Sequence, residues 1–240
     1  MQKTEHDKTV DDSGLFLGLP PDVATQFASL SRRRRLADGE LLYARGDVAD
    51  ALFGLIQGQL RLSNVAPDGR EVLVMLGAPG DWLGDVSLFD GLARTHNAYA
   101  MGECEVFVLP KAKLQGLLDV EPQLYRHFVT RLARALRFAL SYIDDAALLP
   151  LTARLAKRLL DLARMYGEDT PQGVCVDLHL TQEDLGRMLG ASRQSISKEL
   201  NRFQKQGWLE LQYGKVVICD QAPLQRLVEQ PSVAVNGSPF

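Results

Sequence analysis

The fold is decided by residues 180–207, LTQEDLGRMLGASRQSISKELNRFQKQG, a stretch that predicts two short helices joined by a tight turn. Thr181 is suited to cap the first helix, with Asp184 three residues later as its reciprocal partner. Gly190 ends this helix, and Ser192 can cap the next one. Each helix carries one apolar face, which indicates packing against a core. The apolar positions are Leu185, Met188 and Leu189 in the first helix and Ile196, Leu200 and Phe203 in the second.

The polar face of the second predicted helix carries side chains that can read DNA. Arg and Gln make bidentate hydrogen bonds to purine edges in the major groove, while Lys and Arg hold phosphates and a helix N-terminus adds a favourable dipole. Two such helices with a glycine-containing turn form the helix-turn-helix arrangement. The alternative is an ordinary helical hairpin with a solvated face, but caps, turn and both faces agree with DNA binding. The residues expected at the DNA are Thr181, Gln182, Ser192, Arg193, Gln194, Ser197, Lys198, Asn201 and Arg202, and Lys205 lies on the same face.

The composition is that of an ordinary globular protein. Of 240 residues, 46% are hydrophobic and 24% are charged, which is enough for two domains with their own cores. The net charge is −3, so the positive charge that DNA binding requires must be local. The N-terminus is polar, and no apolar run reaches the roughly 20 residues of a membrane-spanning helix. We therefore expect a soluble, cytoplasmic protein.

Three cysteines, Cys104, Cys175 and Cys219, are far apart and odd in number. No Cys-x-x-Cys or Cys/His ligand spacing occurs, which argues against a disulfide framework or a zinc site. Small buried side chains are the interpretation we favour, with a redox-sensing thiol as the alternative. The sequence has no nucleophile elbow, metal-ligand spacing or P-loop, and we expect no enzymatic activity.

Short segments between turns characterise residues 36–110. Asp68-Gly69 between two apolar runs is a strong hairpin signal, and Gly58 is expected to separate two further strands. Strands at this spacing predict a β-barrel or β-roll. The four arginines at 32–35 are better explained as a solvated first strand than as a nucleic-acid patch.

A stripe of apolar residues at steps of three and four runs along a long predicted helix over residues 122–149. This coiled-coil seam favours a parallel contact between two chains over a helix buried in its own domain. Phe128, Phe138 and Leu140 lie off the seam and could pack on the roll. Pro150 ends the helix and marks the expected hinge. The seam consists of Val129, Leu132, Leu136, Ala139, Ile143 and Ala146.

The chain after Pro150 completes a C-terminal domain. Residues 152–166 predict an amphipathic helix, and residues 167–173 a polar loop before a short strand. Two strands at 208–211 and 216–218 form the hairpin of a winged helix. The expected divisions of the chain are a disordered tail at 1–14, a β-roll sensor domain at 15–120, a dimerisation helix at 121–149, a winged helix-turn-helix domain at 150–230 and a loose tail at 231–240.

The turn PGDWLGDVSLFDGLART, residues 79–95, is the candidate ligand site of the roll. Gly84 allows close backbone approach, and the residues after it can begin a short helix whose free N–H groups bind an anion. Arg94 adds a guanidinium suited to a phosphate, and Asp85 could accept from a ribose hydroxyl. The alternative is a structural turn in which Asp85 and Arg94 pair with each other. The effector-binding residues expected here are Gly84, Asp85, Val86, Ser87, Arg94 and Thr95.

The order of roll, long helix and winged helix resembles the CRP/FNR family of bacterial transcription regulators over about residues 20–225. The resemblance implies an α+β fold with an N-terminal β-roll of the jelly-roll type, a long dimerisation helix and a C-terminal winged helix-turn-helix. It further implies a homodimer bound to two-fold symmetric double-stranded DNA, a small effector in the roll, and RNA polymerase as a partner. The two segments quoted above carry the resemblance, together with the glycines at Gly46, Gly58, Gly69 and Gly80.

The effector turn departs from the cyclic-AMP-binding members of that family. Asp85 stands where they have Glu and Thr95 where they have Ser, with one residue fewer between the pairs. Those members also present Thr-Ser to the adenine, whereas an ungapped count places Ala139 and Leu140 there, and neither can hydrogen-bond a base. The candidate effectors are therefore cyclic di-GMP or another phosphate-bearing ligand, then cyclic AMP, and also no effector at all.

Two other cofactor types are not expected. The oxygen-sensing branch uses N-terminal cysteines for an iron–sulfur centre, and this chain has none before Cys104. The four histidines, His6, His96, His127 and His179, have no partner pattern that would support a haem. We expect no metal site.

We call the two predicted helices of residues 180–207 the reader. The second of them, the reader helix, also departs from the family. Arg193 matches the guanine-reading arginine, but Gln194 replaces a frequent Glu and Lys198 an arginine. Glu accepts a hydrogen bond from cytosine, whereas Gln pairs with adenine. We therefore expect a DNA site related to the family palindrome and altered next to the Arg193 contact. A non-DNA nucleotide-binding module, such as a regulatory subunit, is the alternative of a different class.

Overall fold

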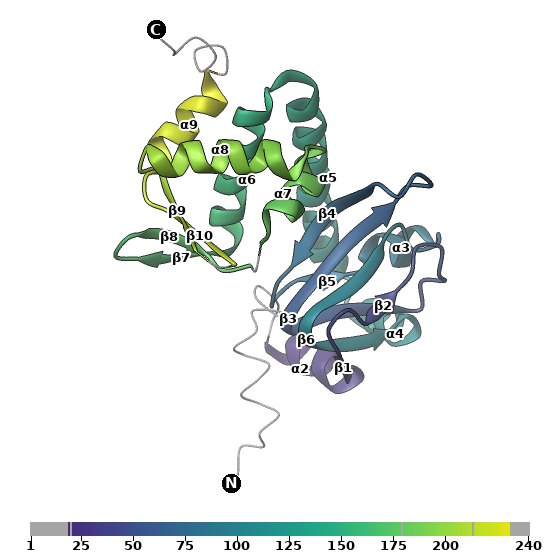
Figure 1. The fold of residues 1–240 in the computed structure, drawn as a ribbon. Helices are drawn as coiled ribbons and strands as arrows, with labels where there is room; N and C mark the ends of the chain where they lie inside the picture. The colour runs from purple at the N-terminus through teal and green to yellow at the C-terminus, as the bar shows by residue number, and fades with distance from the viewer. Residues whose placement is uncertain (1–18, 20, 179, 213, 231–240) are drawn as a thin grey trace, which may run out of the picture. The chain divides into compact units, whose positions relative to one another are not determined.

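The computed structural model describes residues 19, 21–178, 180–212 and 214–230, and the tails expected at 1–14 and 231–240 lie outside that range. The chain forms two compact units that divide between Leu136 and Arg137, inside the long helix (Figure 1). Within the described part of the chain, no helix combines the length and apolar character that a membrane span needs. The hinge expected at Pro150 stays a prediction.

The first unit is a β-roll with helices packed against it. Its six-stranded antiparallel sheet has the order β1-β6-β3-β4, with β2 paired to β6 and β5 to β3. The β-roll predicted from the turn spacing is therefore confirmed. The elements are α2 Pro21–Leu30, β1 Arg32–Leu36, β2 Leu41–Tyr43, β3 Ala51–Val65, β4 Glu71–Gly77, β5 Trp82–Leu83, α3 Asp85–Asp90, β6 Asn97–Pro110, α4 Lys111–Val120 and α5 Leu124–Leu148.

One long strand, β3, replaces the two strands that Gly58 was expected to separate. The pairing of β3 with β6 shifts register on both sides of Gln57, which marks a bulge rather than a break. Gly58 has φ +85°, and an added Cβ would lie 2.5 Å from the carbonyl oxygen of Glu103 and 2.7 Å from Sγ of Cys104. Glycine therefore lets the strand bend here and continue.

The arginine run forms strand β1, as predicted. Arg33 and Arg35 lie 3.4 and 3.9 Å from the Glu105 carboxylate, and Arg34 lies 2.9 Å from Glu40. These ion pairs hold the arginine side chains in place along the edge of the sheet.

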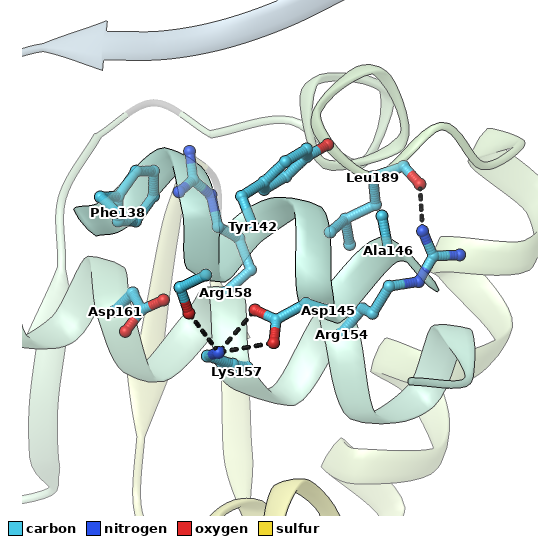
Figure 2. A pocket seen from close by; sticks show the side chains of 10 residues that line it. Phe138, Tyr142, Asp145, Ala146, Arg154, Lys157, Arg158, Asp161 and Leu189 are labelled. Atoms are coloured by element: carbon cyan, nitrogen blue, oxygen red, sulfur yellow. Dashed lines mark hydrogen bonds and ion pairs between the residues drawn. The ribbon is translucent and has the colours of Figure 1, made fainter. Parts of the chain in front are cut away.

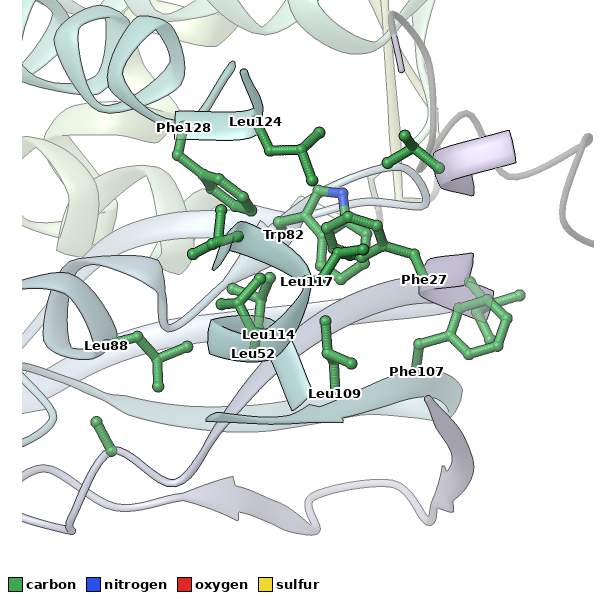
Figure 3. Packing of buried hydrophobic residues seen from close by; sticks show 14 residues of the cluster. Phe27, Leu52, Trp82, Leu88, Phe107, Leu109, Leu114, Leu117, Leu124 and Phe128 are labelled. Atoms are coloured by element: carbon green, nitrogen blue, oxygen red, sulfur yellow. The ribbon is translucent and has the colours of Figure 1, made fainter. Parts of the chain in front are cut away.

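A layer of apolar side chains joins the sheet to helices α2, α4 and α5 (Figure 3). Phe27 of α2 meets Trp82 edge-on, with ring centroids 5.6 Å apart. Phe128 of α5 is buried in this layer, which confirms that it packs on the roll. Helix α4 was not predicted, although Leu114 and Leu117 bury one face of it.

The three cysteines are free thiols. Cys104 is buried, and its Sγ donates to the carbonyl of Gln59 at 2.9 Å. Burial raises the pKa of the Cys104 thiol, which disfavours the reactive thiolate. Cys104 therefore fits the interpretation as a small buried side chain.

The second unit is a winged helix with a four-stranded antiparallel sheet of order β7-β8-β10-β9. The polar loop predicted at 167–173 is wrong, because residues 167–170 form a strand that pairs with β8. Helix α9 was also missed; it follows an Asp220 cap and packs on α6. The elements are α6 Leu151–Tyr166, β7 Gly167–Thr170, β8 Gly173–Val176, α7 Gln182–Leu189, α8 Arg193–Lys205, β9 Leu209–Gln212, β10 Lys215–Ile218 and α9 Gln221–Glu229.

The predicted seam of α5 is open to solvent in the single chain. Val129, Leu136 and Ile143 are each 61% exposed, and Leu140 is also exposed rather than packed on the roll. The other seam positions, Ala139 and Ala146, are exposed, and Leu132 is half-buried.

Replacing Gly58 by alanine is expected to destabilise the roll by about 2–5 kcal/mol, since a left-handed backbone and overpacking each add a cost. Gly69→Ala is the matched control, because Gly69 has φ +84° but nothing within 4 Å of an added Cβ. That variant should cost only about 1–2 kcal/mol. Urea unfolding measures the free energy of unfolding of both variants. Equal losses of stability in the two variants would contradict the prediction.

Candidate nucleic-acid interface and effector site

The first helix of the reader begins at the predicted capping box. Thr181 Oγ1 accepts from the backbone N–H of Asp184 at 3.0 Å, and the Asp184 carboxylate accepts from the Thr181 N–H at 3.2 Å. Gly190 ends the helix in the left-handed conformation, with φ 63°. Gly186 was not singled out from the sequence, yet an added Cβ there would lie 2.6 Å from the carbonyl oxygen of Ala191. The signal in the sequence for this close contact was a glycine four residues before Gly190, which caps the helix.

The second helix, α8, has one buried and one exposed face. Ser192 caps it by accepting from the N–H of Ser195 at 3.1 Å. Phe203 stacks on Trp208 with ring centroids 5.5 Å apart, which fixes the helix on the wing. The apolar residues Ile196, Leu200 and Phe203 are fully buried, whereas Thr181, Ser192, Arg193, Gln194, Lys198, Asn201 and Lys205 are exposed.

Besides the two capping residues, other expected DNA residues are partly engaged or partly buried within the protein. Arg202 lies 3.4 Å from the carboxylate of Glu199 and stacks over Phe203. Ser197 accepts from the side-chain amide of Asn201 at 3.4 Å. Gln182 and Ser197 are half-buried. The exposed cations of α8 are therefore Arg193, Lys198 and Lys205.

The wing is the hairpin of β9 and β10, and Tyr213 of its turn lies outside the described residues. Lys215 Nζ lies 2.5 Å from the Asp177 carboxylate, and this hydrogen bond raises the pKa of Lys215. The lysine side chain remains exposed enough to carry positive charge beside the reader.

The last turns of α5 are joined to α6 and α7 by polar contacts around a small pocket (Figure 2). Lys157 Nζ lies 2.8 Å from Ser141 Oγ and 2.6 Å from the Asp145 carboxylate. Tyr142 donates to the carbonyl of Met188, and Arg154 donates to that of Leu189 at 3.1 Å. The C-terminal half of α5 is thereby fixed to the first reader helix.

Phe138 belongs to this pocket, so the prediction that it packs on the roll is wrong. The guanidinium of Arg158 lies 5.3 Å from the Phe138 ring centroid, and its Nε lies 3.4 Å from Met188 Sδ. Burial lowers the pKa of Arg158 and raises the pKa of Asp161. Phe138 remains 37% exposed, and its partner is the guanidinium of Arg158 in α6, a cation–π contact that an apolar pattern along one helix does not predict.

Arg94 lies inside the roll, at the predicted effector turn. Its side chain is 2% exposed, with Nη1 2.8 Å from the carbonyl of Gly84 and Nη2 2.5 Å from that of Ala51. The guanidinium also lies 4.7 and 5.3 Å from the ring centroids of Tyr43 and Phe53. Burial lowers the pKa of Arg94. Among described residues its nearest carboxylate is that of the exposed Asp50, at 3.6 Å.

Asp85 pairs with the long helix, so the alternative pairing of Asp85 with Arg94 is wrong. Arg131 Nη2 of α5 lies 2.8 Å from the Asp85 carboxylate and 2.5 Å from the carbonyl of Trp82. Arg131 was missed, although it shares one helical face with the buried Leu124 and Phe128. That inward position was the available signal.

The other residues expected to bind the effector lie along the turn, and their side chains do not converge on one point. Gly84 lies against the guanidinium of Arg94. A Cβ added to this glycine would be 2.2 Å from Nη1 of Arg94. Ser87 Oγ donates to the carbonyl of Ala93 at 3.1 Å, and Thr95 Oγ1 lies 2.8 Å from His96 Nδ1. Val86 is exposed in the first turn of α3. The turn therefore combines a buried cation, a close glycine and an accessible first helical turn.

Comparison with known proteins gives a consistent picture. The family model of the cyclic nucleotide-binding domain matches residues 33–121, and that of the Crp-like helix-turn-helix domain matches residues 153–227. A CRP-like cAMP-activated global transcriptional regulator of Mycobacterium tuberculosis is 30% identical over 223 residues, covering 92% of this chain and 98% of that protein. The cAMP-activated regulator Vfr of Pseudomonas aeruginosa is 30% identical, covering 80% of this chain and 90% of Vfr.

Solved structures agree on the fold. FixK2 of Bradyrhizobium japonicum matches with a TM-score of 0.74 at 21% identity, covering 82% of this chain and 96% of that one. A CRP-family transcriptional regulator of Thermus thermophilus matches with a TM-score of 0.64 at 28% identity, covering 82% of this chain and 97% of that one.

Proposed function

The chain belongs to the CRP/FNR family of transcription regulators, and we propose that it acts as a homodimer on a two-fold symmetric DNA site under control of a phosphate-bearing effector in the roll. DNA binding through a helix-turn-helix and the presence of a cyclic nucleotide-binding domain follow from the family. The dimer, the contact residues and the effector are the proposed parts. The observation that carries the proposal is the exposed polar face of α8 on a buried apolar base.

The proposed DNA contacts follow from where α8 exposes its side chains. Arg193 and Gln194 occupy the first turn, where the N-terminal residues of a recognition helix meet base edges. Arg193 is suited to guanine and Gln194 to adenine, while Lys198 further along is suited to a phosphate. Thr181 and Ser192 cap the two helices and lie at N-termini, where backbone N–H groups hold phosphates.

The proposed dimer contact is the seam of α5. Three large apolar side chains at 61% exposure, spaced seven residues apart, form a row that a monomer would leave in water. A parallel pairing of two such helices buries the row and relates the two chains by a two-fold axis. Two reader helices then meet half-sites about one helical turn of DNA apart. The seam residues are Val129, Leu132, Leu136, Ala139, Ile143 and Ala146.

The proposed effector site rests on the buried charge of Arg94. A guanidinium without hydration requires compensation, and here two carbonyls and an exposed carboxylate 3.6 Å away supply it. An anionic group at the turn would be a stronger partner than those carbonyls. Cyclic AMP is tested first, since the two relatives named above are described as cAMP-activated. Cyclic di-GMP and cyclic GMP follow.

A regulator of the same fold without an effector is the second candidate. The observation that favours it is that both terminal nitrogens of Arg94 already have acceptors in the folded chain. In that case Arg94 is a structural residue, and its cation–π contacts with Tyr43 and Phe53 stabilise the folded roll.

For the DNA interface we predict that Gln194→Glu changes specificity and Lys198→Ala does not. The first substitution replaces an adenine-pairing group by a cytosine acceptor, worth about 1–3 kcal/mol of discrimination at one base pair. The second should weaken all sites alike and lower the salt slope by about one. Selection of bound sequences, followed by titration over salt, measures both. An unchanged preference in Gln194→Glu would argue that α8 does not meet the bases there.

For the dimer we predict that Leu136→Lys yields monomers at micromolar concentration, because a charge would be buried twice in the seam. Leu148→Lys is the control, since Leu148 is exposed on the same helix but lies outside the seam. Sedimentation velocity separates the two states. A wild-type chain that sediments as a monomer would refute the dimer, whatever the variants do.

For the effector we predict a calorimetric binding signal with at least one of cyclic AMP, cyclic GMP and cyclic di-GMP. Val86→Asp should weaken it at least about tenfold, because a like charge a few ångströms from the ligand phosphate costs more than about 1.4 kcal/mol. Val48→Asp places the same charge on another exposed valine of the roll and should leave the affinity unchanged. Absence of heat with all three nucleotides, at unaltered DNA affinity, would favour the effector-independent regulator.

A further inference from the structure

A hollow opens in the roll where strands β1, β2, β3 and β6 come together. It has a volume of about 410 Å³, which is within the range of small-molecule pockets. It belongs wholly to the first unit and includes none of the residues predicted for the effector turn. We call it the mouth cavity. It is lined by Arg32, Arg34, Leu42, Asp47, Val48, Asp50, Ala51, Phe53, Val108 and Pro110.

The floor of the mouth cavity is apolar. Leu42, Phe53 and Val108 are at most 6% exposed and belong to the apolar interior of the roll. Val48 stands at the rim with 83% of its surface in water, although it is a large aliphatic side chain beside that floor. A ligand with an apolar body would lie on the small surface that the floor leaves open and would cover Val48, and covering Val48 removes most of the apolar surface from water.

The charges around the rim are unequally engaged. Arg34 Nη2 lies 2.9 Å from Glu40, and the side chain also donates to the carbonyls of Leu41 and Leu42 at 3.4 Å. Asp47 accepts from the backbone N–H of Ala44 at 2.8 Å.

Arg32 differs from these groups. Its side chain is exposed, and no described residue makes a hydrogen bond or ion pair with it. Asp50 is 80% exposed but directs one oxygen toward Arg94. Of the two guanidinium groups that line the cavity, that of Arg32 is therefore the one without a partner among the described residues, and a guanidinium matches an anion and in particular a planar carboxylate.

We propose that the mouth cavity binds a small organic acid, with its carboxylate on Arg32 and its apolar body on Leu42, Phe53 and Val108. The ligand class follows from the combination of one free guanidinium and an apolar floor. The site is separate from the effector turn, but the two share a wall. Asp50 and Ala51 face the cavity and also hold the guanidinium of Arg94.

The test uses the full-length protein with methyl-labelled leucine and valine, titrated with hexanoate and benzoate and with their neutral amides. The carboxylates are expected to shift the methyl signals of Leu42 and Val108, and each amide to bind at least tenfold more weakly. Arg32→Gln should lower the affinity for the carboxylates at least tenfold and leave that for the amides within twofold.

Arg35→Gln is the matched control, since Arg35 lies on the same strand, outside the cavity, with its side chain 88% exposed. It should leave both affinities unchanged. Equal losses in the two arginine variants, equal binding of acid and amide, or no shift with either acid at millimolar concentration would overturn the proposal.

A second pair of variants separates this site from the effector turn. Val48→Asp should weaken hexanoate binding at least tenfold, whereas Val86→Asp should not alter it, the reverse of the pattern expected for a cyclic nucleotide. Both valines are exposed, so both variants are expected to fold. Hexanoate binding that is lost in Val86→Asp and kept in Val48→Asp would place the acid at the turn and refute the mouth cavity as its site. Failure of every cyclic nucleotide to bind would leave this result unaffected.

Discussion

Burying the Arg94 guanidinium in the roll removes its hydration, and neighbouring groups must replace what water supplied. The replacements come from separate segments: the carbonyl of Ala51 at the start of β3, the carbonyl of Gly84 before α3, and the rings of Tyr43 and Phe53. One side chain thus ties two strands and the effector turn together. A displacement of Arg94 would remove this donor from the carbonyls of Gly84 and Ala51 at the same time.

Helix α5 is the element that both units share, and its polar contacts differ along its length. In its first half, Arg131 holds Asp85 and the carbonyl of Trp82, at the same turn that encloses Arg94. In its second half, Asp145 and Tyr142 contact α6 and α7. A continuous helical backbone therefore joins the attachment at the effector turn to the attachment at the capped reader, and the exposed seam spans both.

The local signals of the sequence were sufficient for the reader and insufficient for the effector turn. Thr181, Asp184 and Gly190 cap α7 as predicted, because capping depends on residues within one helical turn. The partner of Asp85 is 46 residues away and that of Arg94 lies 43 residues away, at distances that no periodicity encodes. The loop predicted at 167–173 failed for a different reason, since its strand pairs with β8 only a few residues further along the chain, from Gly167 with Val176 to Thr170 with Gly173. Polar residues at an edge strand carry no apolar alternation.

In the proposed effector site, the guanidinium of Arg94 is already hydrogen-bonded to two carbonyls of the folded chain. An anion that replaced the carbonyls of Gly84 and Ala51 as the partner of Arg94 would use part of its binding free energy in rearranging the turn. Its apparent affinity is lower than the intrinsic one, and the difference equals the free energy of opening the turn. That opening is also what a ligand must favour in order to shift a population, since equal affinity for both forms shifts nothing. For such an anion, the lower apparent affinity and the shift in population would both come from displacing the same two carbonyls from Arg94.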